Sequence, residues 1–78
     1  MSWNYRILAH RDGDEWNFKM HEVYYDTEGN PESYTAKEVG VGAESIEGVN
    51  WVLDKMKESV KRPILSADNF PNEWLVNK

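Results

Sequence analysis

The chain has 78 residues, of which 14 are acidic and 9 are basic, giving a net charge of −5; 40 % are hydrophobic, 13 % are aromatic and none is cysteine. This length predicts a single domain, and the content of apolar and aromatic residues is too high for a disordered chain. Disulfides and zinc or iron–sulfur sites built on thiolates are excluded. There is neither a membrane-spanning apolar run nor a signal peptide pattern, so we expect a soluble, cytoplasmic protein with no membrane association.

Size and charge also narrow the classes of function. A domain this small buries only about 60–65 % of its unfolded surface, so an enclosed active-site cavity would remove much of its core. This disfavours an enzyme that encloses its substrate. The acidic balance makes nucleic-acid binding unlikely, because such binding depends on lysine and arginine at the phosphates. It is compatible with a basic protein partner.

Two strands are expected over residues 3–11 and 15–26, where apolar and polar residues alternate. Asp12-Gly13 lies between them and favours a tight hairpin turn, since glycine adopts a positive φ without steric cost. In the second segment the apolar positions change parity after His21-Glu22. A bulge near residues 20–22 would explain the change, and burial on both faces is the alternative. We favour the bulge.

A third strand is expected over residues 33–41, followed by a helix over residues 45–62. Ser45 is a good N-cap residue, and Pro63 ends the helix. Five apolar residues recur at helical spacing and are expected to pack on the sheet: Ile46, Val49, Leu53, Met56 and Val60.

The predicted fold class is α+β. It consists of a three-stranded antiparallel β-meander followed by one α-helix packed on one sheet face, then a short C-terminal segment. The domain spans residues 1–65. The segment 66–78 carries Phe70, Trp74, Leu75 and Val76, so we expect it to fold back onto the domain; docking onto a partner is the alternative.

Three sequence blocks together resemble a group of small, uncharacterised bacterial proteins. The blocks are WNYRI at residues 3–7, HEVYYD at residues 21–26 and RPIL at residues 62–65. The group shares the order of these blocks, a glycine-containing turn after the tyrosines and a helix that begins near Ser45. It has no established activity, so the resemblance implies a bacterial source, boundaries and fold, but no site.

No motif for catalysis, metal binding or cofactor binding is present. His21 and Glu22 are adjacent in a strand and point to opposite faces, so they cannot hold one ion without a bulge, and His10 across the hairpin completes no metal signature. The chain lacks a nucleophile elbow and a phosphate-binding glycine loop. We therefore expect no enzyme activity, no metal and no cofactor.

The aromatic residues provide the hypothesis about function. Seven lie on the expected strands, and one helix can cover only one sheet face. The exposed face would then bind a protein partner or a second copy, with Tyr24, His21, Glu22 and Tyr34 as candidate binding residues. The sequence thus favours a small, acidic, non-catalytic protein-interaction module: an inhibitor or adaptor of a basic partner, or a self-associating domain. The alternative is a binder of a small ligand or of single-stranded nucleic acid on the aromatic sheet face.

Overall fold

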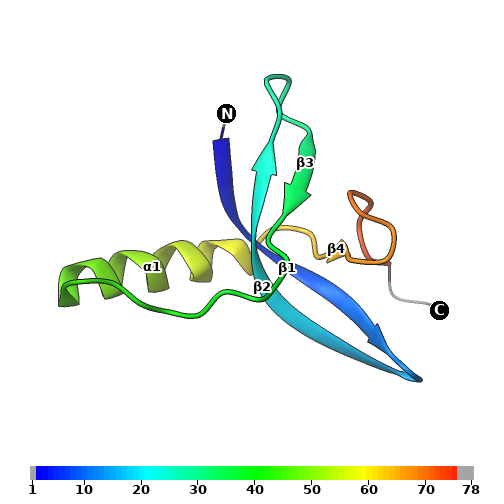
Figure 1. Ribbon diagram of the computed structural model, residues 1–78, viewed down its shortest axis with the longest axis horizontal. Helices are drawn as coiled ribbons and strands as arrows, with labels where there is room; N and C mark the ends of the chain where they lie inside the picture. Colours follow the sequence, from blue (N-terminus) through cyan, green and yellow to red (C-terminus); the bar gives the residue numbers. More distant parts are fainter. Residues whose placement is uncertain (1, 76–78) are drawn as a thin grey trace.

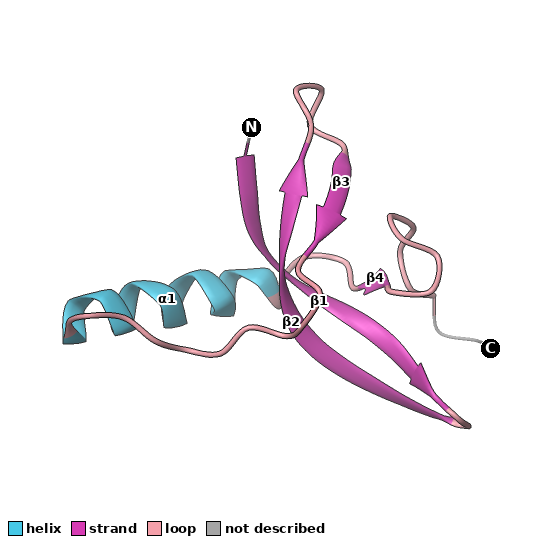
Figure 2. Ribbon diagram, in the orientation of Figure 1, coloured by secondary structure: helices cyan, strands magenta, loops and turns pink. Residues whose placement is uncertain are grey.

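The computed structural model describes residues 2–75 and shows a small α+β fold. One helix and four strands are present in this part of the chain: β1 (Ser2–Asp12), β2 (Glu15–Tyr25), β3 (Pro31–Tyr34), α1 (Ile46–Ser59) and β4 (Leu65–Ser66). The sheet order is β3-β2-β1-β4 (Figures 1 and 2). The α+β class and the antiparallel pairing of the first three strands are confirmed. The three-stranded meander is wrong, because β4 joins the sheet as a fourth strand parallel to β1.

Strands β1 and β2 form a long, twisted hairpin. Their register runs without interruption from Ser2 opposite Tyr25 to Asp12 opposite Glu15. The tight turn is confirmed, and Gly13 has a φ of 63°, the positive value that such a turn needs at its first position. The bulge expected near residues 20–22 is absent from this pairing. His21 is buried on one face and Met20 is half-buried on the other, so burial on both faces explains the change of parity.

Strand β3 is shorter than the expected 33–41, since it ends at Tyr34. Beyond it, the amide of Thr35 donates to the carbonyl of Glu22 (3.0 Å), and the amide of Val39 donates to the carbonyl of Met20 (2.9 Å). Between these two bonds the chain advances by four residues, whereas β2 advances by only two. Residues 36–38 therefore loop out of the sheet. This stretch is rich in polar residues of low strand propensity, which explains the early end of the strand.

Helix α1 begins as expected but presents a different side to the sheet. Ser45 Oγ accepts a hydrogen bond from the amide of Gly48 at 3.0 Å, which confirms the N-cap. The predicted apolar stripe is not the buried side, because Ile46 is 74 % exposed, Leu53 47 % and Val60 64 %. Val52 (8 %) and Ser59 face the strands instead.

The reason lies in the placement of the helix. Figure 1 shows that α1 extends away from the strands and that its N-terminal end is the part farthest from the sheet. The C-terminal part meets the sheet, where Ser59 Oγ lies 3.3 Å from Met20 Sδ. A helix beside a narrow sheet buries only a thin strip of its surface.

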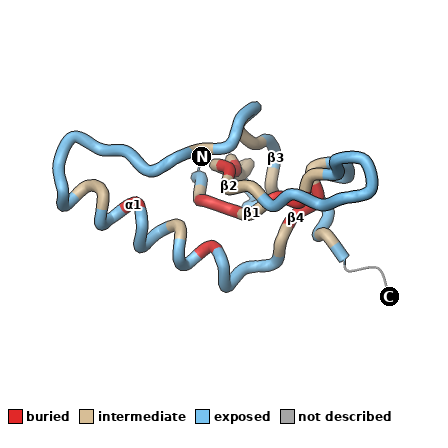
Figure 3. Tube along the Cα trace, turned by 90° about the horizontal axis from the view of Figure 1, so that it is seen from below, coloured by how far each residue is buried: buried red, intermediate tan, exposed pale blue. Residues whose placement is uncertain are grey.

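The core sits where β1, β2 and β4 meet, as the buried segments in Figure 3 show. Leu8, Val23 and Leu65 form its centre, and four partly buried side chains surround them: Tyr25, Tyr34, Ala67 and Phe70. The chain after β4 turns back along it, since the amide of Trp74 donates to the carbonyl of Ile64 at 2.7 Å. The end of this segment, including Val76, lies outside the described residues. No helix in residues 2–75 is long and apolar enough to cross a membrane.

Candidate functional site

The four predicted binding residues divide between the two faces of the sheet. Residues paired across β1 and β2 point to the same side, so His21 shares a face with Arg6, and Tyr24 shares the other face with Trp3. We call the first the histidine face and the second, which carries Met20 and meets α1, the helix face. Tyr34 pairs with Val23 and therefore belongs to the histidine face. The candidate residues do not form one site.

His21 and Tyr34 are packed rather than displayed. His21 is 1 % exposed, and its ring meets Tyr34 edge-on at 5.2 Å between centroids. Phe70, from the segment after β4, lies 4.8 Å from the Tyr34 ring. The same chain therefore buries His21 and half-buries Tyr34 on the histidine face.

Glu22 and Tyr24 bind each other on the helix face. The Tyr24 hydroxyl donates a hydrogen bond to Glu22 Oε1 at 2.7 Å. This bond is the main reason why the pKa of Tyr24 is raised. Burial, aided by the charge of Glu22, raises the pKa of Tyr5, which lies opposite Glu22. The pair is a local polar contact on the helix face of the sheet.

The two histidines meet as the hairpin suggests, with His10 Nε2 2.9 Å from His21 Nε2. His21 Nδ1 contacts the carbonyl oxygen of Thr35 at 3.0 Å and its hydroxyl at 3.2 Å. Glu22 points to the opposite face, so it adds no third ligand. Within residues 2–75 no group of three or more histidine or acidic side chains could hold a metal ion.

Arg6 is a structural residue that the sequence did not single out. It is buried, its Nη1 donates to the Tyr25 hydroxyl (2.9 Å), and its Nη2 donates to the carbonyl of Pro63 (2.7 Å). Tyr25 in turn donates to Asn4 Oδ1 at 2.7 Å. Arg6 thereby fixes the chain that leaves α1 against β1. The only signal in the sequence is a charged residue inside an apolar strand.

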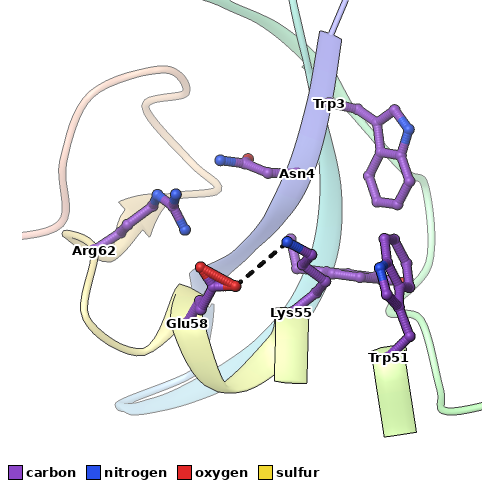
Figure 4. Close-up of a pocket in the computed structure, with 7 residues that line it drawn as sticks. Trp3, Asn4, Trp51, Lys55, Glu58 and Arg62 are labelled. Atoms are coloured by element: carbon purple, nitrogen blue, oxygen red, sulfur yellow. Dashed lines mark ion pairs between the residues drawn. The ribbon is translucent and has the colours of Figure 1, made fainter. Parts of the chain in front are cut away.

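This connection helps to shape a cleft between the N-terminal half of β1 and α1. Its volume is about 340 Å³. Trp3 and Trp51 are both exposed and lie on the same side of the cleft, as Figure 4 shows. Seven residues line it: Trp3, Asn4, Tyr5, Trp51, Lys55, Glu58 and Arg62.

The cleft carries more positive than negative charge, in contrast to the whole chain. Lys55 Nζ lies 3.5 Å from Glu58 Oε2 and 5.7 Å from the centre of the Trp51 ring. In the described part of the chain, Arg62 forms no ion pair. Its guanidinium is therefore available for an anionic group.

A second uncovered surface lies on another side of α1. Ile46, Leu53 and Val60 are exposed and seven residues apart, so they form a line along the helix. We call this line the apolar stripe. Trp51 and Lys55, which line the cleft, lie on the far side of the helix from Leu53, because each residue turns the helix by about 100°.

No family model, curated protein or solved structure matches the chain. The resemblance to small bacterial proteins stays a prediction from the three sequence blocks.

Proposed function

We propose that this protein is a small, acidic, non-catalytic protein-interaction module that pairs with a second copy of itself through α1. The observation that carries the proposal is the apolar stripe. Ile46 and Leu53 of α1 and its C-cap residue Val60 remain 47–74 % exposed. Single exposed apolar residues are ordinary, but an aligned set on one helix marks a contact surface.

The charges along α1 favour a second copy in the antiparallel direction. Glu44 and Glu47 lie at the N-terminal end, whereas Lys57 and Lys61 lie at the C-terminal end. Antiparallel packing about a two-fold axis brings the acidic end of one helix beside the basic end of the other. A parallel pair would bring like charges together.

The same symmetry aligns the apolar stripe. With Leu53 at the axis, it packs against Leu53 of the other copy, and each Ile46 meets the other copy's Val60. The half-buried Val49 and Met56 border the stripe and widen the apolar surface. The stripe is therefore complementary to itself, which is the condition for an isologous dimer.

Other classes of function have less support from the geometry. A sheet face that stacks single-stranded bases needs free aromatic rings with basic residues beside them. His21 is only 1 % exposed, and the Tyr34 ring packs against Phe70 of the C-terminal segment. An inhibitor of a basic partner would use acidic surface, whereas the three residues of the apolar stripe are uncharged and only its N-terminal end lies beside acidic residues.

Sedimentation equilibrium of the full chain tests this proposal. We expect a monomer–dimer equilibrium, and Leu53→Glu should weaken it at least tenfold because a charge would lie at the axis. Leu75→Glu is the matched control, since Leu75 is 78 % exposed and lies outside α1. A wild-type chain that stays monomeric at high concentration, or a dimer unaffected by Leu53→Glu, contradicts the proposal. Circular dichroism verifies that both variants fold.

A further inference from the structure

The N-terminal half of β1 has an open edge. Strand β4 pairs only with Leu8 and Ala9 of β1. On that side of β1, the carbonyl of Ala9 accepts a hydrogen bond from the amide of Ala67 at 3.0 Å. Backbone groups of a strand point alternately to its two sides, so those of Trp3 and Tyr5 point to the same side as those of Ala9. No strand of the described chain pairs with them there.

The cleft lies at this open edge. Trp3, Asn4 and Tyr5 all line it, although consecutive side chains of a strand point to opposite faces. A cleft reached by three consecutive residues must therefore adjoin the strand's edge. Its side chains are held in place, because the buried Tyr5 meets Trp3 edge-on at 5.2 Å and Asn4 accepts a hydrogen bond from Tyr25.

The other wall of the cleft is one side of α1 and the turn after it. Trp51, Lys55, Glu58 and Arg62 follow at intervals of four, three and four residues, which places them along one line. Figure 4 shows Trp51, Lys55 and Glu58 on the helix and Arg62 on the turn after it. The result is a groove with a strand edge on one side and a helix on the other.

We propose that this groove binds an extended acidic segment of another protein, which adds to β1 as a further strand. Main-chain hydrogen bonds to the outward groups of Trp3 and Tyr5 would hold the segment. A carboxylate of the segment would pair with the guanidinium of Arg62, which favours planar, bidentate acceptors. An apolar side chain on the same segment would pack on the indole rings of Trp3 and Trp51.

Charge decides between the candidate occupants. A basic segment would meet Lys55 and Arg62 with only Glu58 in its favour. A second copy that paired through its own β1 edge would bring the same two cations close to their symmetry mates. An acidic segment neutralises the excess positive charge in the groove, so it is the occupant that the lining fits.

The proposal deepens the interaction role by naming a partner, but it does not depend on self-association. The groove lies on the far side of α1 from Leu53. It therefore stays open in the proposed dimer and in a monomer. Failure of one proposal can be distinguished from failure of the other by testing the groove in the Leu53→Glu variant.

The probe is a capped hexapeptide of alternating valine and glutamate, titrated into the full chain by NMR. We expect shifts of the Trp3 and Tyr5 amides and of both indole N–H signals. Arg62→Gln should weaken binding at least tenfold. Lys61→Gln is the matched control, because it removes the same charge one residue away from the groove, and it should change affinity less than threefold.

Two further peptides test the mode of binding. A valine–lysine hexapeptide should bind at least tenfold more weakly. Methylation of alternate backbone nitrogens of the valine–glutamate peptide should abolish binding, since it blocks strand pairing. The proposal is overturned if 1 mM of the unmodified peptide gives no shifts, if the methylated peptide binds equally well, or if Arg62→Gln and Lys61→Gln have the same effect.

Discussion

The Nε2 atoms of His10 and His21 lie 2.9 Å apart. The contact of His21 Nδ1 with Thr35 determines which of the two histidines donates the hydrogen. The carbonyl oxygen of Thr35 can only accept, so His21 Nδ1, 3.0 Å away, must carry a hydrogen and donate it. Neutral His21 therefore has a bare Nε2, which accepts the N–H of His10. A second proton on His21 would place its Nε2–H against the N–H of His10, so this contact would persist only if His10 moved its own hydrogen to Nδ1.

We predict that the protein loses stability on mild acidification because of His21. Burial lowers the pKa of its imidazole below 6.5; His10 and Lys19 act in the same direction, while the Thr35 carbonyl and Glu38 oppose. The unfolded chain then takes up this proton at a higher pH than the folded one. The stabilisation is complete above pH 6.5 and is lost as the pH falls through the lower, folded value.

Two measurements check this sign. An NMR titration should give a pKa below 6.5 for the His21 imidazole. The urea concentration at the unfolding midpoint of the wild type should decrease as the pH is lowered from 7.5 to 5. In His21→Gln that part of the pH dependence should disappear. A His21 ring that titrates at or above 6.5 contradicts the assignment.

The side of α1 that faces the sheet can be tested with neighbouring residues. Val52→Ala should lower the free energy of unfolding by roughly 2 kcal/mol, because it removes two buried methyl groups. Leu53→Ala should cost less than about 1 kcal/mol in dilute protein, where its half-exposed side chain has no second copy to contact. Urea denaturation at low micromolar concentration measures both. A larger loss of stability for Leu53→Ala than for Val52→Ala would show that the side of α1 that carries Leu53 packs on the sheet, as the sequence indicated.

Helix propensity alone predicts that Gly48→Ala stabilises the protein, whereas the packing around Gly48 predicts no gain in stability. A Cβ atom at this position would lie 2.8 Å from Ala43 Cβ and 3.3 Å from Ser45 Oγ. Replacing a helical glycine by alanine ordinarily stabilises by about 0.5–1 kcal/mol. Here the close approach of Ala43 should cancel that gain or reverse it.

A double-mutant cycle isolates the cause. Gly48→Ala should recover its stabilising effect in the Ala43→Gly background, because the colliding methyl group is gone. Thermal or urea unfolding of the four chains provides the comparison. If Gly48→Ala stabilises the wild type as much as it stabilises Ala43→Gly, the contact has no energetic role.

Phe70 and Trp74 should contribute unequally to stability, although both are aromatic and come from the segment after β4. Phe70 packs on the core and lies 4.8 Å from the Tyr34 ring, so Phe70→Ala should cost roughly 2 kcal/mol. Trp74 meets Phe18 edge-on at 5.1 Å, but Phe18 is half exposed. Trp74→Ala should therefore cost about 1 kcal/mol. Equal losses in urea denaturation would show that the two contacts are equivalent.

The sequence predicted the features that depend on neighbouring residues. The hairpin follows from alternation on both sides of Gly13, and the helix start follows from the hydroxyl of Ser45. The buried side of α1 could not be predicted in this way, because Val52 and Leu53 are both apolar and the choice depends on where the sheet lies. Strand β4 has only two residues, too few for any periodic pattern.

In the candidate site too, contacts that depend on neighbouring residues could be predicted and contacts between distant segments could not. The approach of His10 to His21 follows from hairpin pairing. The covering of Tyr34 by Phe70 depends on the path of a segment that has no regular structure. The groove between β1 and α1 depends on Arg6, whose bond to Pro63 joins residues 57 positions apart. No pattern of neighbouring residues predicts such a contact.

The pairing of β4 with β1 also orders the events of folding. The β1–β2 hairpin closes through a two-residue turn, so it can form early and by itself. Pairing of β4 with β1 is slower, because it must close a loop that contains the third strand and the helix. The same dependence acts in reverse when the native chain opens. Detachment of β4 breaks the bond between Ala67 and Ala9 and extends the open edge of β1 beyond Trp3 and Tyr5 toward the centre of the sheet. A bound strand along that edge would then lengthen by displacing β4, so partner binding and the closing of the chain's own sheet compete for one row of backbone groups.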